Sequence, residues 1–191
     1  MDKNTSDQDL IKQCLAHKKQ AQELLYLRFS GKMMSVCLRY AGSRPEAEDM
    51  LQEGFIRVFK SLPQFKATGS LEGWIRSIIV HVAIRNWQQQ KKNEREELNV
   101  HFELQDSTVS AIDQLSAKEL MAMITKLPNG YRMVFNMYIL DGYSHQEIAT
   151  MTGIQEGTSR SQLAKSRMVL QKMILSQQVI LNKSCEDEKE R

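Results

Sequence analysis

Three Ser-x-x-Glu motifs, each placed where apolar residues begin to recur at helical spacing, are the strongest structural signal in the sequence. They match the capping box, in which a serine and a glutamate satisfy the first free N–H groups of a helix. The three pairs are Ser43 with Glu46, Ser116 with Glu119, and Ser144 with Glu147. Glycine and proline number only 12 of 191 residues, about half of average usage. The sequence therefore predicts an all-α fold and excludes a sandwich, barrel or propeller.

Apolar periodicity predicts four helices in the N-terminal half. They cover residues 7–16, residues 20–40, a segment that starts at the Ser43 cap, and a segment from about Ser70. In the fourth, Leu71, Trp74, Ile75, Ile78 and Val82 follow i, i+3, i+4, i+7 and i+11 spacing, which is typical of an amphipathic helix. In the second, the residues expected to face inward or nearly so are Leu24, Leu25, Leu27, Phe29, Met33, Met34, Val36 and Cys37.

In the C-terminal half the sequence predicts four more helices, over residues 116–127, 131–140, 144–151 and 156–175. The first is expected to stop before Pro128, because the residue that precedes a proline avoids the helical region. The second is expected to end at Asp141 and Gly142.

The charge pattern divides the chain into blocks. Residues 1–92 carry 15 basic and nine acidic side chains, residues 93–115 carry one and six, and residues 116–191 carry ten and eight. We expect two small helical domains, 1–92 and 116–182, joined by a flexible acidic linker at 93–115 and followed by a disordered tail at 183–191. An exposed loop inside a single domain is the alternative interpretation of the middle block.

Several classes of protein are not indicated. The polar N-terminus does not look like a signal peptide, no apolar run could span a membrane, and the three cysteines form no CxxC pair. We expect a cytoplasmic protein without direct membrane insertion, metal or cofactor. The sequence contains no Walker loop, HExxH motif or nucleophile elbow, so no catalytic residue and no enzyme activity is predicted.

Residues 144–167 have the spacing of a DNA-binding helix-turn-helix. Ala149 lies where the two helices must cross closely, and Gly153, four residues later, suits a turn with positive φ. The second helix would present small residues, hydroxyls and cations to a major groove. The residues expected to contact duplex DNA are Glu156, Gly157, Thr158, Arg160, Ser161, Ala164 and Lys165. The alternative is an ordinary helical hairpin with a solvated basic face.

One residue departs from the pattern. Ser159 occupies a position that usually holds a branched apolar side chain, which packs the second helix against the first.

The helix that begins after Ser43 has two faces. Its buried stripe is expected to be Ala47, Met50, Leu51, Gly54, Phe55 and Val58. The other face carries Glu46, Asp49, Gln52, Glu53 and Ile56. An acidic face with one exposed apolar residue suits a basic protein partner, while an ordinary solvated face remains the alternative.

The fourth helix mixes aromatic residues with Arg, Asn and Gln, which suits single-stranded nucleic acid. Of its two tryptophans, Trp74 is expected in the core, and Trp87, nearer the polar end, is expected to be exposed.

In this order, these motifs resemble the extracytoplasmic-function sigma factors of bacterial RNA polymerase, over about residues 8–176. EAEDMLQEGFIRVFKSLPQF is similar to region 2.2, GSLEGWIRSIIVHVAIRNW to regions 2.3 and 2.4, and the segment from Leu127 to Met173 to region 4. The resemblance implies a transcription initiation factor whose partners are core RNA polymerase (the β′ clamp helices and the β flap) and promoter DNA. An anti-sigma factor is a further partner known for many relatives.

The resemblance also implies roles for individual residues. The acidic face, Glu46, Asp49, Gln52, Glu53 and Ile56, would bind core polymerase. The seven DNA-binding residues expected on the second helix of the helix-turn-helix would read the −35 element. The −10 element would be melted and bound by Phe65, Lys66, Ser70, Arg76, His81, Arg85 and Trp87. The family often has Asn at His81, Asp at Arg85, and Arg at Gln88 and Gln89, so a relative's promoter sequence cannot be transferred. A conventional dimeric helix-turn-helix regulator, acting without polymerase, is the alternative function.

Overall fold

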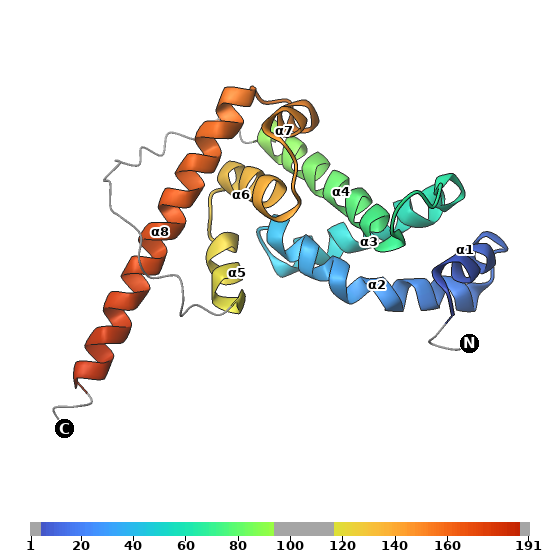
Figure 1. The fold of residues 1–191 in the computed structure, drawn as a ribbon, viewed down its shortest axis with the longest axis horizontal. Coiled ribbons are helices and arrows are strands. Elements are labelled where there is room, and N and C mark those ends of the chain that lie inside the picture. Colours follow the sequence, from blue (N-terminus) through green and yellow to red (C-terminus); the bar gives the residue numbers. More distant parts are fainter. Residues whose placement is uncertain (1–4, 94–116, 188–191) are drawn as a thin grey trace. The chain divides into compact units, whose positions relative to one another are not determined.

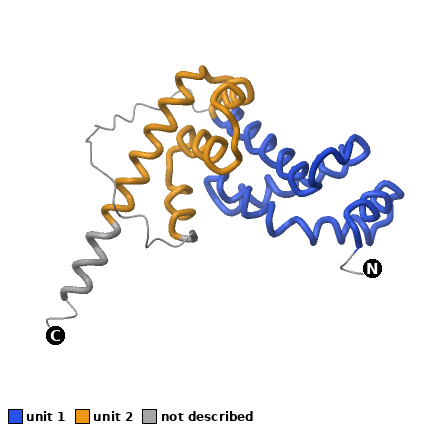
Figure 2. The backbone as a smooth tube through the Cα atoms, in the orientation of Figure 1, with its two compact units in different colours: residues 1–90 blue, residues 91–191 orange. Residues whose placement is uncertain are grey.

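The computed structural model describes residues 5–93 and 117–187, with side chains described for 5–92 and 119–176. Within these ranges every regular element is a helix, which confirms the predicted fold class (Figure 1). The chain divides into two compact units, residues 1–90 (unit 1) and 91–191 (unit 2) (Figure 2). Most of the expected acidic linker and the Ser116 cap lie outside the described residues.

Unit 1 is built around a long helix that packs against its neighbours on both sides in sequence. Its helices are α1 (Asp7–Leu15), α2 (Lys19–Tyr40), α3 (Arg44–Ser61), the 3₁₀ turn η1 (Leu62–Gln64) and α4 (Leu71–Asn93). Helix α2 packs against α1 and α3. Helix α3 buries the six residues expected from its periodicity. On α2, however, Leu27 is 64% exposed, so its predicted inward orientation is wrong.

Serine side chains cap three of the four long helices of this unit. The hydroxyls of Ser6, Ser43 and Ser70 accept hydrogen bonds from N–H groups three residues later, at 3.1, 3.3 and 3.1 Å. The cap at Ser43 differs from the expected capping box, because the Glu46 carboxylate accepts from the N–H of Gly42, at 2.7 Å. The predicted helix start is nevertheless confirmed.

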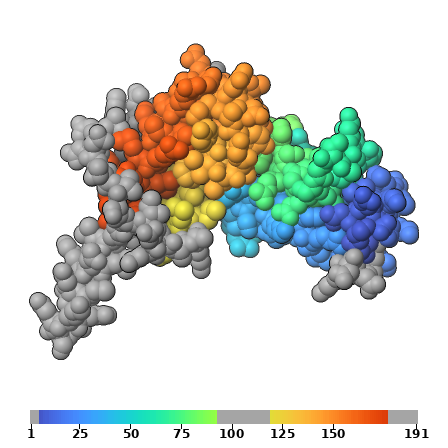
Figure 3. Space-filling view, viewed as in Figure 1, coloured from blue at the N-terminus to red at the C-terminus, as the bar shows by residue number. Residues whose placement is uncertain are grey.

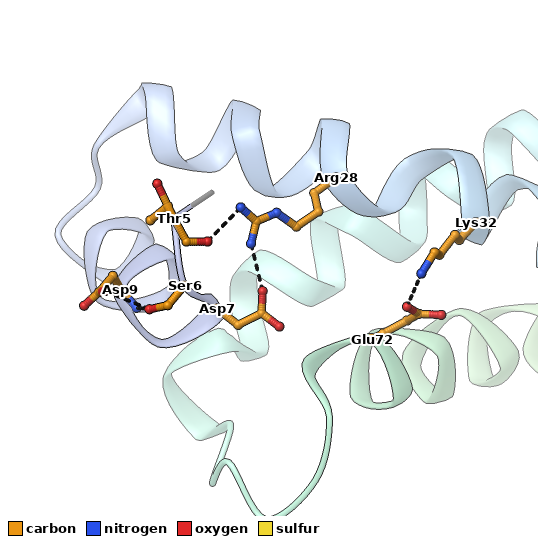
Figure 4. Close-up of polar contacts among 7 residues, drawn as sticks. All are labelled: Thr5, Ser6, Asp7, Asp9, Arg28, Lys32 and Glu72. Carbon is orange, nitrogen blue, oxygen red and sulfur yellow. Dashed lines mark hydrogen bonds and ion pairs between the residues drawn. The ribbon is translucent and has the colours of Figure 1, made fainter. Parts of the chain in front are cut away.

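Two ion pairs join α2 to other parts of unit 1 (Figure 4). The Arg28 guanidinium donates to the Asp7 carboxylate at 2.8 Å and to the Thr5 carbonyl at 2.9 Å, which ties the start of α1 to α2. Lys32 of α2 donates to Glu72 in the first turn of α4, and this bond lowers the pKa of the Glu72 carboxyl. These contacts link the first and last helices of the unit to α2.

Gly54 lets α3 approach α4 closely. A Cβ atom built at this position would lie 2.1 Å from Cδ1 of Ile79, a side chain with no exposed surface. Buried side chains that are packed on all sides cannot move away freely. Gly54 is therefore required for close helix contact.

We expect Gly54→Ala to lower the free energy of unfolding of unit 1. Overpacking lowers this free energy by about 1–3 kcal/mol. The better helix propensity of alanine offsets about 1 kcal/mol of that loss. Urea unfolding followed by tryptophan fluorescence measures this unit alone, because both tryptophans belong to α4. Gly31→Ala in α2 is the matched control, because no atom lies within 4 Å of its added Cβ. Equal effects of the two substitutions would contradict the close approach.

Unit 2 contains α5 (Ala117–Thr125), α6 (Asn129–Phe135), the π-helical turn η2 (Asn136–Leu140), α7 (His145–Thr152) and α8 (Glu156–Asp187). Helices α5, α6 and α7 all pack on α8, and the side chains of α6 and α7 abut those of α8 in the space-filling view (Figure 3). Buried Arg132 ties the α5–α6 turn by donating to the carbonyls of Thr125 and Leu127, at 2.9 and 3.3 Å. Helix α8 is thus the central element of the unit.

Three helices differ from the prediction in their bounds. Helix α6 begins at Asn129, two residues before the expected start, and the expected helix continues to Leu140 only as the π-helical turn η2. Helix α5 ends at Thr125, two residues early, because Lys126 and Leu127 form tighter backbone bonds to residues three earlier. Helix α8 was expected to end near residue 175, yet it continues to Asp187, so residues 183–187 of the expected tail are helical. Its continuation has no glycine or proline that would stop it. Among the helices described, none combines the length and apolar character needed to cross a bilayer.

Candidate nucleic-acid and polymerase interfaces

The turn between α7 and α8 has the geometry of a helix-turn-helix. Ser144 and Glu147 form the predicted capping box at the start of α7, with the Glu147 carboxylate 2.8 Å from the Ser144 N–H. Gly153 ends the helix in the left-handed conformation, φ 72°, and its N–H donates to the Ala149 carbonyl at 2.9 Å. A side chain with a Cβ would be strained there. The expected helix-turn-helix is confirmed in its backbone geometry.

The unusual Ser159 proves to be part of the core of this motif. It has no exposed surface, and Ile148 of α7 and Leu163 of α8 are buried as well where these two helices pack on each other. Its hydroxyl lies 2.9 Å from Nδ1 of His145, the first residue of α7. A hydrogen bond therefore occupies the place where apolar contact was expected.

The outer face of α8 is open to solvent. All seven expected −35 residues are exposed in the structure, over the first three turns of the helix. The Arg160 guanidinium forms an ion pair with Glu156 one turn earlier, and this hydrogen bond raises the pKa of Arg160. Both groups are well exposed, so the pair can open at little cost when a phosphate or base competes.

Helix α4 separates the expected −10 residues onto two faces. One face carries His81 and Arg85, and both are exposed. They follow Trp74, which was not among the expected −10 residues, at i+7 and i+11, so all three share this face. Trp87 lies on the opposite side and is only 8% exposed, so the expectation that it is exposed is wrong. Arg76 also lies away from this face and pairs with Glu72 at 3.5 Å.

Trp74 was expected in the core, and this assignment is wrong as well. It is half-buried, and its ring lies 5.1 Å from the ring of Phe65 in the preceding loop. The fully buried stripe of α4 is formed by Leu71, Ile75, Ile79 and Val82. A stripe at i, i+4, i+8 and i+11 leaves Trp74 at its edge, and this alternative register could have been considered from the sequence.

His81 has one ring nitrogen engaged and one available. Nδ1 lies 2.6 Å from the Ser77 carbonyl, which can only accept, so Nδ1 carries the proton. In the neutral ring Nε2 is then an acceptor on the exposed side of α4. Such a group can receive a hydrogen bond from an exocyclic amine of an unstacked base.

The remaining −10 candidates lie in the loop before α4. Lys66 and Ser70 are exposed, and Phe65 is half-buried. The Ser70 hydroxyl already caps α4 by accepting from the Gly73 N–H. Ser70 therefore has a structural function beside the expected contact with DNA.

The acidic face of α3 is partly engaged inside unit 1. Asp49 and Gln52 are exposed, and Ile56 is 50% exposed beside them. Glu53 pairs with Arg57 at 2.6 Å. Glu46 is half-buried, and its carboxylate accepts from Gln90 of α4 at 2.6 Å as well as from Gly42. Asp49, Gln52 and Ile56 are the most accessible members of this face.

The described side chains include no group of three or more histidines, cysteines, aspartates or glutamates arranged to hold a metal ion. Cys14 and Cys37 are buried, and burial raises the pKa of the Cys37 thiol to about 12. These two cysteines lie in the core of unit 1, and the inward orientation expected for Cys37 is confirmed.

The two units correspond to two known protein regions. Residues 25–93 match the family model of Sigma-70 region 2, and residues 117–170 match that of Sigma-70, region 4. Together these segments cover more than half of the chain.

Individual proteins are also similar to this chain. The ECF RNA polymerase sigma factor SigE of Mycolicibacterium smegmatis is 26% identical over 151 residues, which cover 76% of this chain and 58% of the relative. The RNA polymerase sigma-H factor of Pseudomonas aeruginosa is 23% identical over 180 residues, covering 88% of this chain and 93% of the relative. The sigma factor RpoE of Bartonella quintana, solved in complex with the anti-sigma factor NepR, is similar in structure, with a TM-score of 0.48, 18% identity and coverage of 78% and 94%. With both regions present in order, the chain belongs to the extracytoplasmic-function sigma factors of bacterial RNA polymerase.

Proposed function

We propose that this sigma factor directs core RNA polymerase to promoters by melting and binding the −10 element with unit 1 and reading the −35 element with unit 2. The family consists of transcription initiation factors and not of enzymes. The observation that carries the proposal is the outer face of α8, the second helix of a regular helix-turn-helix. Arg160, Ser161 and Lys165 are exposed on this face. Such a face fits the major groove of duplex DNA.

The −10 contact is assigned to one face of α4 and to the loop before it. Trp74 and Phe65 offer aromatic surface for stacking, and His81 and Arg85 offer hydrogen bonds and charge on the same helix. Extrusion of a base costs a few kcal/mol, which stacking and polar contacts must offset. We therefore replace Trp87 by Trp74 in the proposed contact set, and Arg76 becomes a secondary candidate.

Core polymerase is the proposed partner of α3. Asp49 and Gln52 precede the exposed Ile56 on the same face of α3, so this surface combines negative charge with an apolar side chain. This composition suits a basic helical surface of another protein better than it suits DNA.

Run-off transcription tests the proposed function directly. The full chain is combined with core polymerase on linear templates randomised at the −35 and −10 positions, and the transcripts are sequenced. We expect initiation only when the chain is present, with enriched sequences at both elements. Binding of the chain alone to a palindromic duplex, without any initiation in the presence of core polymerase, would instead support a conventional dimeric regulator.

A further inference from the structure

His145 joins three elements of unit 2 at the point where α7 begins. Its ring stacks on that of Tyr138 in η2, with centroids 4.4 Å apart and an angle of 20° between the planes. At the edge of the ring, Nδ1 lies 2.9 Å from the hydroxyl of Ser159 in α8. The histidine is half-buried and the serine is fully buried.

The hydrogen bond fixes α8 relative to α7 in a way that apolar contact would not. Apolar packing is non-directional, whereas a hydrogen bond weakens steeply when its distance or angle changes. Ser159 is followed directly by Arg160 and Ser161 on the outer face. A small rotation of α8 about its axis would therefore move the groups proposed to meet DNA.

We propose that Tyr138, His145 and Ser159 form a polar latch that sets the orientation of α8 for promoter reading, which makes His145 and Ser159 positioning residues for −35 recognition. The inference rests on the proposed function of unit 2. Neither residue needs to touch DNA, because each acts through the exposed residues of α8. A buried serine in place of an apolar residue is otherwise unexplained, since an unpaired hydroxyl in the core is destabilising.

The charges around the ring suggest how the latch responds to pH. The groups that face His145 are Glu156, Arg160 and Arg167 of α8 and the Tyr138 ring of η2. Burial lowers the pKa of His145, and the guanidinium groups of Arg160 and Arg167 lower it further, while Glu156 acts in the opposite direction. The positive end of α7, where His145 is the first residue, also disfavours a charged ring.

The direction of the pH effect follows from this lowered pKa. Between the pKa of His145 in the folded protein and its value of about 6.5 in the unfolded chain, the unfolded chain binds more protons. The stability that His145 contributes is therefore present above about pH 6.5 and is lost as the pH falls toward the folded pKa. A protonated ring can still donate to the Ser159 hydroxyl, but it is repelled by the guanidinium groups of Arg160 and Arg167, so we expect the latch to loosen over the same interval.

The test measures −35 discrimination by the complete holoenzyme. The probe is a fork-junction DNA carrying the −35 duplex enriched by the wild-type protein, compared with the same fork carrying a scrambled −35 sequence. The ratio of the two dissociation constants is the −35 ratio. Affinity for the scrambled fork reports holoenzyme formation and −10 binding, which the latch does not affect.

Four substitutions probe the latch. Ser159→Ala and His145→Phe each remove one partner of the hydrogen bond, and we expect each to lower the −35 ratio at least fivefold at pH 7.5. The double variant should be no worse than either single variant, because the effects of two partners in one bond are not additive. His145→Asn keeps a polar atom near Nδ1 and should stay within twofold of wild type. Thr150→Ala, which removes a hydroxyl bonded only to the Gln146 carbonyl of its own helix in the structure, is the matched control.

The pH profile distinguishes positioning by the ring from general packing. We expect the wild-type −35 ratio to fall between pH 7.5 and 5.5 more steeply than the ratio of His145→Asn. Equal profiles would overturn the role of the ring. Circular dichroism melting identifies any variant that fails to fold. If both single variants melt below the assay temperature, His145→Asn decides the matter: wild-type discrimination supports the latch, and loss of discrimination overturns it.

Failure of the latch and failure of the proposed function give different results. If Ser159→Ala and His145→Phe are folded and keep the wild-type −35 ratio, the latch is overturned while the proposed function stands. If the wild-type holoenzyme prefers no −35 sequence at all, both are overturned.

Discussion

Arg160→Ala will weaken promoter binding by about 5- to 150-fold if its guanidinium contacts a base edge, which corresponds to about 1–3 kcal/mol. Arg160 is exposed on the outer face of α8, and its pairing with Glu156 positions the guanidinium over the first turns of that helix. Lys165→Ala on the same face removes a second cation. Holoenzyme affinity for promoter fragments with each base substituted in turn measures both effects.

The dependence of the lost affinity on base sequence and on salt concentration shows whether each side chain contacts a base or a phosphate. Loss of a base contact relaxes specificity at one position. Loss of a phosphate contact weakens binding to all sequences alike and reduces the slope of log affinity against log salt concentration by about one. Lys126→Ala is the matched control, because Lys126 is an exposed cation of unit 2 outside α8. If both variants behave like this control on every sequence and at every salt concentration, α8 does not present its outer face to DNA.

Reversal of charge on α3 will separate core polymerase binding from folding. We expect Asp49→Lys combined with Glu53→Lys to lower the affinity for core polymerase at least tenfold, because like charges placed opposite each other cost several kcal/mol in an interface. The cost to unit 1 is small. Asp49 is exposed, and the Glu53–Arg57 pair is a helix-surface pair worth about 0.2–0.5 kcal/mol.

A charge-matched variant controls for the change in net charge. Asp9→Lys combined with Glu23→Lys makes the same change at exposed positions on α1 and α2, away from α3. Affinity is measured by competition with a labelled sigma factor for core polymerase, and tryptophan fluorescence confirms that unit 1 is folded. Equal affinities of the two double variants would show that the acidic face of α3 is only solvated.

The sequence predicted the helices and caps well because these features are local. The capping serines Ser43 and Ser144, the turn at Gly153 and the buried stripe of α3 all depend on residues within a few positions of one another. Spacing over such distances fixes which residues share a helix face. The same reasoning identified the exposed face of α8.

The sequence predicted individual side-chain environments less well on α4. Its residues are apolar on more than one side between Ile79 and Ile84, so two registers of the buried stripe were compatible with the pattern. The chosen register placed Trp74 inside and Trp87 outside, whereas in the structure Trp74 is half-buried and Trp87 is buried. Periodicity alone cannot choose between registers when a helix is buried over most of its circumference.

Local sequence determined where the helices of this protein begin, which small residue makes the sharp turn, and that an acidic helix is followed by an aromatic one and a basic one. Tertiary structure decided which polar groups remain available. Glu46 is engaged by Gln90, 44 residues later, and Ser159 by His145, 14 residues earlier. Such pairs depend on how two helices pack, and helix packing is set by the fit of many side chains from separate segments of the chain. For this reason the family resemblance followed from motifs, whereas the polar latch became evident only in three dimensions.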